Sequence, residues 1–272
     1  MTATAQAIWS LTNPRVKAAV RLRDRGARED TGLSLVDGGR ELLRALDQSV
    51  DVDHAFVCRQ LVIGPDASAA LDALERGGTP ILEVSPAVLA KVAFGDRSDG
   101  IVAVIRPLVR SLADLTPGER PLVVVIEAVE KPGNIGAIMR TADAVGAGAV
   151  IAADPHTDVF NPNAIRASLG TIFSVPLAVA TAAQTLEWLV GHGVTPIAAR
   201  VDAPEPYTSV DLGGAVAIVL GSEATGLSPI WTDPRVRPVR IPMLGAADSL
   251  NVSVAAAVLL FEAQRQRSAH RP

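Results

Sequence analysis

Residues 215–227 read Ala215-Val216-Ala217-Ile218-Val219-Leu220-Gly221-Ser222-Glu223-Ala224-Thr225-Gly226-Leu227. The first six residues are apolar, which predicts a buried strand, and the loop behind them carries two glycines and small polar side chains. Two further segments share this arrangement, one behind the apolar run 122–126 and one to which Val239-Arg240-Ile241 leads. They read Asn134-Ile135-Gly136-Ala137-Ile138-Met139-Arg140-Thr141-Ala142, and Ile241-Pro242-Met243 followed by Ser249-Leu250-Asn251-Val252-Ser253-Val254-Ala255. Because ligands of α/β proteins bind beyond the carboxyl ends of the strands, we expect all three segments at one rim of one sheet.

Apolar strand patterns alternate with helical patterns beyond residue 122, which favours an α/β domain with a largely parallel sheet covered on both faces. We expect strands at about 122–127, 149–153, 175–179, 195–199, 215–220 and 238–241, and helices at about 134–146, 162–169, 182–191 and 251–266. Residues 13–106 predict a separate α/β unit. We expect three helices in this unit: one that begins at Pro14, one at 39–46 and one at 66–76. The expected strands are 33–36, 54–57, 81–84 and 100–105. Prolines and glycines interrupt both patterns between them, so we expect domains at 1–108 and 119–272 with a linker at 109–118.

Composition sets broad limits on the protein class. The chain has 272 residues, 49% of them apolar, and a mean hydropathy of +0.30, which is enough for a core without covalent staples. A single cysteine, Cys58, excludes an internal disulfide, and the sequence has no paired Cys/His spacing for structural zinc, so we expect no metal. There is no secretory or membrane-spanning pattern, so we expect a soluble, cytoplasmic protein.

Charge is unevenly distributed along this acidic chain, whose net charge is −4. The first 28 residues contain a basic arm in which Asp24 is the only acid, and its cations are Arg15, Lys17, Arg21, Arg23, Arg25 and Arg28. A solvated helix face is the commoner explanation of such a run, and contact with RNA phosphates is the alternative.

Each motif also has an ordinary structural explanation. Arg140 either acts on a ligand or pairs with an acid such as Asp143 or Glu127. Ser249 and Asn251 precede a strongly apolar helix, where at least one of them is expected to be an N-cap. The loop at 221–226 lacks the lysine and hydroxyl of a phosphate loop and the spacing of a dinucleotide fingerprint. No histidine falls within the three segments, so a Ser-His-Asp or Cys-His catalytic set is not expected.

Taken together, in this order, the three segments resemble the signature motifs of the SpoU/TrmH-type RNA 2′-O-ribose methyltransferases of the SPOUT class. The resemblance covers the C-terminal domain. It implies an α/β domain with a deep trefoil knot, S-adenosylmethionine as the cofactor, and a homodimer with each site near the dimer interface. The N-terminal unit, through Val36-Asp37-Gly38-Gly39-Arg40-Glu41-Leu42 and Gly100-Ile101-Val102-Ala103-Val104, is similar to the ribosomal-protein-L30e-like RNA-binding domain of many members.

The resemblance also assigns roles to individual residues. Arg140 is the implied catalytic group, with support from Asn134, Glu223, Ser249 and Asn251. The implied cofactor contacts are Leu220, Gly221, Ile241, Met243 and Leu250. RNA contact becomes the expected role of Arg15, Lys17, Arg21 and Arg23, and Arg166 is a further candidate. One departure is Lys131, where many relatives have an acid.

The implied function is therefore transfer of a methyl group to a ribose 2′-hydroxyl in RNA. Ribosomal RNA is favoured over tRNA because minimal tRNA-modifying relatives can lack the extra N-terminal domain. The other two interpretations are a catalytically silent RNA-binding homologue and a nucleotide-dependent oxidoreductase. The sequence lacks the dinucleotide-binding fingerprint that the oxidoreductase would need.

Overall fold

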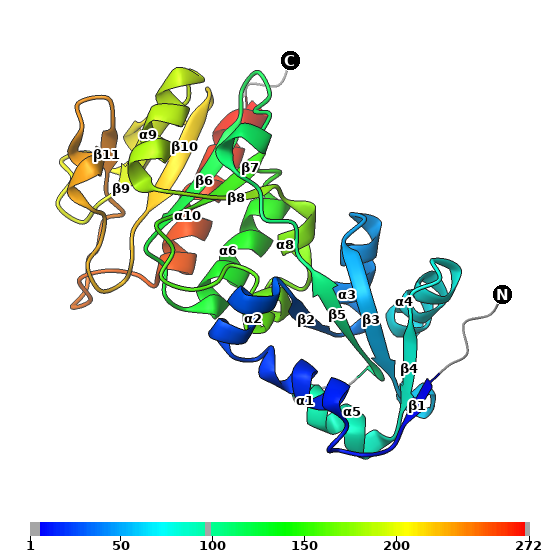
Figure 1. The fold of residues 1–272 in the computed structure, drawn as a ribbon. Helices are drawn as coiled ribbons and strands as arrows, with labels where there is room; N and C mark the ends of the chain where they lie inside the picture. The colour runs from blue at the N-terminus through cyan, green and yellow to red at the C-terminus, as the bar shows by residue number, and fades with distance from the viewer. Residues whose placement is uncertain (1–5, 96–98, 270–272) are drawn as a thin grey trace. The chain divides into compact units, whose positions relative to one another are not determined.

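A computed structural model describes residues 6–95 and 99–269, and it divides into two compact units (Figure 1). The first unit contains residues 1–108 and 160–174, and the second contains residues 109–159 and 175–272. No helix within the described ranges is long and apolar enough to cross a membrane.

The second unit is built on a six-stranded sheet in which every pair of neighbouring strands is parallel. The strand order is β11-β9-β10-β6-β7-β8, with bounds β6 Leu122–Glu127, β7 Ala149–Ala153, β8 Leu177–Ala180, β9 Thr195–Ala199, β10 Val216–Leu220 and β11 Arg237–Val239. Its helices are α6 Pro132–Ala144, α9 Ala182–Gly191 and α10 Val252–Ala269. Every residue of β6, β7 and β10 is buried, as expected for strands covered on both faces. The α/β class and the mostly parallel sheet are thus confirmed.

The expected linker region packs against this second unit. Arg110 forms a bridge with Ala178 of β8, a short 3-10 helix spans Leu112–Asp114, and Leu115 is buried in the core with residues of α9. The prolines and glycine of this segment interrupt the periodic pattern of the sequence, but the segment is packed against the second unit and is not a free linker.

The first unit has a five-stranded mixed sheet in the order β1-β4-β3-β5-β2. Its strands are β1 Gln6–Ile8, β2 Ser34–Asp37, β3 Asp51–Val57, β4 Ile81–Val84 and β5 Ile101–Arg106, and β5 is antiparallel to both of its neighbours. Its helices up to residue 92 are α1 Pro14–Arg21, α2 Arg25–Thr31, α3 Gly39–Asp47, α4 Pro65–Arg76 and α5 Pro86–Val92. Asn13 caps α1, since its side chain accepts a hydrogen bond from the Arg15 N–H at 2.9 Å. Three elements were not predicted from the sequence, namely β1, α2 and α5, which are only three to seven residues long.

Residues 160–174 form α7 (Pro162–Ala167) and α8 (Thr171–Ser174) and pack against β2 and α3 within the first unit. The Ser34 hydroxyl donates a hydrogen bond to the Phe160 carbonyl at 2.7 Å, and Arg44 donates to the Leu169 carbonyl at 2.6 Å. The sequence offered no sign that the chain would return to its first unit here, because the contacts join residues more than 100 positions apart.

Arg166 lies at the centre of this packing. Its Nη1 is 3.2 Å from Oδ2 of Asp37, whose side chain is fully buried, and a side chain at Gly95 would overlap the guanidinium. Burial raises the pKa of the Asp37 carboxyl, while the Phe94 N–H and the Arg166 charge act in the opposite direction. The structure thus gives Arg166 a packing role, and its contact with RNA stays a prediction.

Replacing Arg166 with methionine should destabilise the first unit by on the order of 3 kcal/mol, because a buried carboxylate loses its cation. This decrease in the free energy of unfolding should be smaller at acidic pH. Burial raises the folded-state pKa of Asp37 above its unfolded value, and a protonated Asp37 does not need the guanidinium. Urea unfolding at neutral and acidic pH measures both effects.

The matched control is Arg76→Met, since Arg76 is an exposed arginine of α4 whose side chain bonds to no described residue. An equal decrease in the free energy of unfolding in the two variants at neutral pH would show that the Arg166–Asp37 ion pair does not stabilise the first unit.

Candidate active site

A cavity of about 570 Å³ lies beyond the carboxyl ends of β9, β10 and β11 in the second unit. Its volume is within the range of pockets that enclose small organic ligands. All five residues expected to contact a cofactor line it, namely Leu220, Gly221, Ile241, Met243 and Leu250. Residues 199–202, at and just after the end of β9, also line the cavity and were not expected. Their strand lies between β10 and β11, but strand order cannot be read from the sequence.

The loop 221–227 folds back on itself to form one wall of this cavity. Ser222 and Gly226 exchange backbone hydrogen bonds at 3.2 and 3.0 Å, and the Ser222 hydroxyl accepts one from the Thr225 N–H at 3.1 Å. A Cβ on Gly221 would overlap the carbonyl group of Gly226, so only glycine permits this close approach. The turn leaves the 220–222 backbone beside the cavity and carries Glu223 at its tip.

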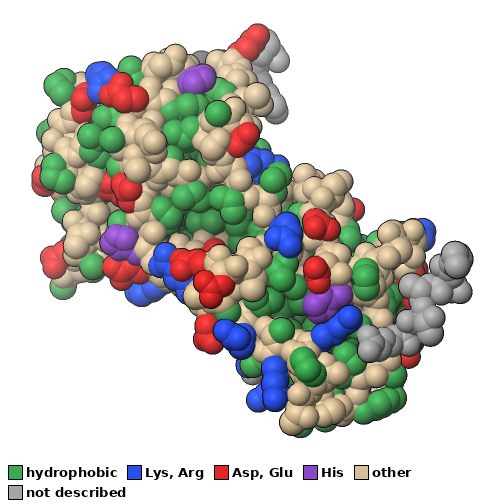
Figure 2. Space-filling model, viewed as in Figure 1, with side chains coloured by type: hydrophobic (Ala, Val, Ile, Leu, Met, Phe, Trp, Pro, Cys, Tyr) green, Lys and Arg blue, Asp and Glu red, His purple; other side chains and the backbone are tan. Residues whose placement is uncertain are grey.

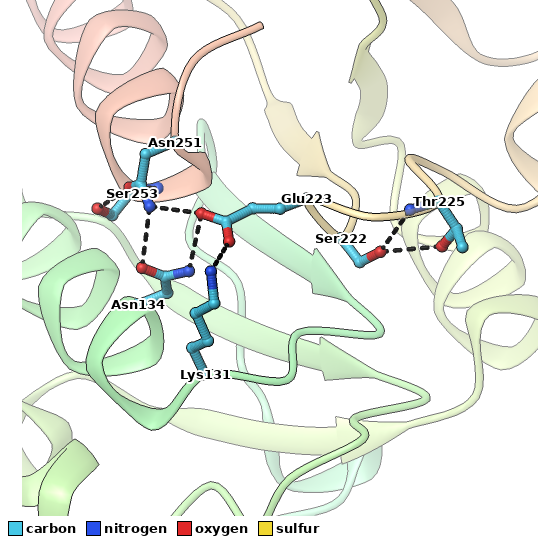
Figure 3. A network of polar contacts seen from close by, with 7 residues as sticks. All are labelled: Lys131, Asn134, Ser222, Glu223, Thr225, Asn251 and Ser253. Atoms are coloured by element: carbon cyan, nitrogen blue, oxygen red, sulfur yellow. Dashed lines mark hydrogen bonds and ion pairs between the residues drawn. The ribbon is translucent and has the colours of Figure 1, made fainter.

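Glu223 joins the three motifs into one polar network (Figure 3). Its Oε1 accepts hydrogen bonds from the side-chain amides of Asn134 at 3.2 Å and Asn251 at 2.5 Å, and its Oε2 lies 2.5 Å from Lys131 Nζ. The Asn251 amide also donates to Asn134 Oδ1 at 3.2 Å. Asn134 lies in α6, Glu223 follows β10 and Asn251 precedes α10, so the three expected residues do meet.

The network lies between two cavities. A second cavity of about 190 Å³ is lined by Lys131, Asn134 and Glu130 among others, and it shares Ser222, Glu223 and Val252 with the larger one. Apolar and polar residues both line the larger cavity, whereas three polar or charged residues of α6 and the segment before it, together with the 222–223 turn, surround much of the smaller one. Such a pair can hold two reactants on opposite sides of one carboxylate.

Lys131 controls the charge of this network. Its ammonium group lowers the pKa of Glu223, and in return the carboxylate raises the pKa of Lys131. The carboxylate is thus kept ionised and the lysine protonated, so Glu223 is a hydrogen-bond acceptor that orients the two amides. The lysine that departs from the usual acid is therefore part of the site.

Asn251 combines the two roles considered for it. Its Oδ1 accepts hydrogen bonds from the Ser253 N–H at 3.0 Å and the Ser253 hydroxyl at 2.6 Å, which caps the start of α10. Its amide nitrogen still reaches Glu223 and Asn134. Ser249 lines the larger cavity, so the cap and the cavity contact belong to different residues of one segment.

Arg140 stands apart from this network. It is exposed on α6, lines neither cavity, and bonds to no described residue through its side chain. At 100° per residue, six positions place Arg140 about 120° around the helix from Asn134. The pairing with Glu127 is not formed, since Glu127 is buried and accepts hydrogen bonds from the Ser228 N–H and hydroxyl at 2.7 and 2.6 Å.

The other residues singled out from the sequence are distributed as follows. Arg15, Lys17, Arg21 and Arg23 lie in or beside α1 of the first unit, and Arg23 donates to the carbonyls of Lys91, Val92 and Ala93 at the end of α5. Among the described residues there is no group of three or more His, Cys, Asp or Glu side chains that could hold a metal ion.

Known protein families match both parts of the chain. Residues 121–261 match the SpoU rRNA Methylase family, and residues 13–103 match the MRM3-like substrate binding domain. The chain belongs to the SpoU rRNA methylase family. The Ralstonia nicotianae 23S rRNA (guanosine-2′-O-)-methyltransferase RlmB is 36% identical over 203 residues, which are 73% of this chain and 82% of that protein. A Streptomyces viridochromogenes 23S rRNA (uridine(2479)-2′-O)-methyltransferase is 29% identical over 262 residues, covering 92% of this chain and 88% of that one.

Solved structures show the same relationship. A crystal structure of an RNA 2′-O ribose methyltransferase is 39% identical, has a TM-score of 0.84 and covers 97% of this chain and all of its own. The AdoMet-bound rRNA methyltransferase from Sinorhizobium meliloti has a TM-score of 0.87 at 29% identity, with 97% and 98% covered. The A. aeolicus TrmH/SpoU tRNA modifying enzyme is 30% identical with a TM-score of 0.50, and covers 56% of this chain and 78% of that one.

Replacing Lys131 with methionine should raise the pKa of Glu223 towards its ordinary value, because Lys131 is the largest cause of the lowering. Carboxyl ¹³C NMR titration of Glu223 measures the change. In the wild type the carboxylate should persist to lower pH, and its hydrogen bonds to Asn134 and Asn251 should be lost only as the pH falls through the lowered pKa.

Lys91→Met is the matched control, since it removes an exposed lysine from the other unit. An unchanged Glu223 titration in Lys131→Met would mean that the 2.5 Å ion pair does not form in solution.

Proposed function

We propose that this protein is an S-adenosylmethionine-dependent methyltransferase that modifies a ribose 2′-hydroxyl in 23S ribosomal RNA. The observation that carries the proposal is the Glu223 network, which brings all three family motifs together between a cofactor-sized cavity and a smaller polar one. A catalytically silent homologue would have no need to keep these side chains in hydrogen-bonding contact. The reaction class also agrees with the full-length relatives, which are named as 2′-O-methyltransferases.

Ribosomal RNA is the better supported substrate. The structures of an RNA 2′-O ribose methyltransferase and an rRNA methyltransferase each cover 97% of this chain, whereas the tRNA-modifying relative covers only 56%. The residues beyond that shared part include a substrate-binding domain of the MRM3-like type. The guanosine and uridine named for the two relatives leave base identity to experiment.

The residues of the larger cavity fit an adenosine-bearing ligand. The main chain at Leu220–Ser222 and around Ile241 and Leu250 offers hydrogen-bonding groups, and Leu220, Leu227, Ile241 and Met243 give apolar walls. When bound, S-adenosylmethionine supplies an electrophilic methyl group on a sulfonium.

The remaining task of the protein is to orient and activate a poor nucleophile. Glu223, Asn134 and Asn251 form a rigid set of donors and acceptors where a ribose can be oriented. Arg140 is always charged, so it is suited to stabilise a developing alkoxide and to bind the neighbouring phosphate, and it is an unlikely general base. Its lack of an acidic partner among the described residues leaves it available for an RNA phosphate.

Two measurements test the proposed function. Calorimetric titration with S-adenosylmethionine and with NAD separates a methyltransferase from an oxidoreductase. Transfer of labelled methyl groups to ribosomal RNA from a deletion strain, followed by mapping of the labelled nucleotide, identifies the substrate. Binding of S-adenosylmethionine without transfer to ribosomal RNA or tRNA would favour the silent homologue.

Arg140→Ala should keep the fold and cofactor affinity but lower the rate of methyl transfer about a hundredfold, equivalent to about 3 kcal/mol. Single-turnover transfer and calorimetry measure the two properties. Arg237→Ala is the control, because Arg237 is an exposed arginine of the same unit that is paired with Glu205. Wild-type turnover of Arg140→Ala on the mapped substrate would exclude Arg140 from the reaction.

A homodimer formed through α10 completes the proposal. One stripe of α10 is apolar and remains uncovered, with Val254 and Phe261 47% and 49% exposed and Ala257 and Val258 half-buried between them. Spacings of three, four and seven residues place these side chains on one helix face. The opposite side of α10 packs against α6, which carries Asn134 and Arg140, so an α10 interface would lie near the site.

Such an enzyme would act in the cytoplasm, where a lone thiol such as Cys58 stays reduced.

Phe261→Asp should convert the dimer into a monomer, with the dissociation constant raised at least about a hundredfold, because each copy would bury an unpaired charge at the apolar stripe. Sedimentation equilibrium measures the shift. Ile63→Asp places the same charge at an exposed apolar side chain of the other unit and should leave the assembly unchanged. A dimer that survives Phe261→Asp must use another surface.

A further inference from the structure

Two neighbouring helices of the first unit carry only positive charge. Helices α1 and α5 pack against each other, and neither they nor the segment 9–13 contains an Asp or Glu. Their four exposed cations are Arg15, Lys17, Arg21 and Lys91, and Figure 2 shows basic side chains over α1. We call these four residues, together with segment 9–13, the α1–α5 face.

The cations of this face are free of the acids that neutralise other arginines. Arg59 pairs with Glu75 and Glu83, Arg235 with Asp233 and Glu187, and Arg265 with Glu262. By contrast, the four side chains of the α1–α5 face form no hydrogen bond or ion pair with any residue that the structure describes. Four unneutralised cations on adjacent helices of a protein with net charge −4 indicate an anionic partner.

An exposed tryptophan lies at the edge of the same face. Trp9 follows β1 and is 71% exposed, whereas Trp231 is buried and Trp188 packs on His192 with ring centroids 4.4 Å apart. A turn holds Trp9 close to α1. The Ser10 carbonyl accepts a hydrogen bond from the Asn13 N–H at 3.2 Å, and the Ser10 and Thr12 hydroxyls bond at 2.8 Å, so the α1 cap begins four residues after the ring.

We propose that the α1–α5 face binds an unpaired stretch of RNA, with its phosphates on the four cations and one base stacked on Trp9. The identification of the polyanion as RNA rests on the proposed function. Unpaired RNA is favoured over a duplex because bases within a helix are already stacked on one another and cannot lie on a protein ring. A purely electrostatic surface for duplex backbone would have no use for an exposed indole.

The first test compares a short single-stranded RNA oligomer with the same oligomer annealed to its complement. Trp9→Ala should weaken binding of the single strand by about tenfold and leave duplex binding unchanged, because each stacked base contributes an affinity of this order. Trp9→Phe should keep most of the affinity, since it retains an aromatic face. Ile63→Ala is the control for removal of an exposed apolar side chain in the same unit, and circular dichroism checks that each variant is folded.

The second test uses salt. In the double variant Lys17→Gln/Arg21→Gln, the slope of log affinity against log salt for the single strand should fall by about 0.7 for each cation removed. Arg76→Gln removes a cation from α4 and should leave the slope unchanged.

Three outcomes would overturn the proposal: an unchanged single-strand affinity in Trp9→Ala, an equal loss for single strand and duplex, or binding of phosphatidylserine vesicles in preference to RNA. These experiments need neither cofactor nor methyl transfer. An enzyme that methylates ribosomal RNA but binds the oligomer equally well without Trp9 therefore refutes the surface alone. A protein that loses oligomer affinity with Trp9 but transfers no methyl group refutes the enzymatic function alone.

Discussion

The site depends on one geometric constraint, the common direction of the six strands in the second sheet. Because every neighbouring pair is parallel, the chain leaves β6, β9, β10 and β11 at the same rim. Backbone that ends a parallel strand has unused hydrogen-bonding groups, and the loops behind these strands present them to a shared space. Motifs separated by up to 117 residues, as Asn134 and Asn251 are, can therefore contact one carboxylate.

Much of this arrangement could be predicted from the chain because it depends on local signals. Apolar runs located all six strands of the second sheet, and the capping role considered for Asn251 was formed. Sequence patterns failed where contacts between distant residues decide the outcome. The 199–202 loop enters the cavity because β9 lies next to β10, and residues 160–174 join the first unit through Ser34, Asp37 and Arg44. Short elements such as β1 were missed because three residues give no measurable periodicity.

Helix α6 places Asn134 and Arg140 in two different environments. Both belong to the first motif, yet helical geometry directs them to different sides of α6, about 120° apart. Asn134 donates a hydrogen bond to Glu223 and accepts one from Asn251, whereas Arg140 is exposed and has no acidic partner among the described residues. In the proposed reaction Arg140 binds an RNA phosphate, and a permanent carboxylate partner would compete with that phosphate. The fixed amides and the unpaired guanidinium therefore fit the two different tasks proposed for the residues of this motif.

Net charge is a poor guide to nucleic-acid binding in this protein, and the distribution of ion pairs explains why. The excess of four acids is a sum over the whole chain, but a phosphate interacts with the charges within a Debye length of about 8–10 Å. At that distance the relevant property is whether a local cation already has an acid beside it. Arg235 and Arg265 are neutralised where they stand, and Arg166 is committed to Asp37. The cations of α1 and α5 are not, so a protein with a net negative charge can still present a locally basic surface to an RNA phosphate.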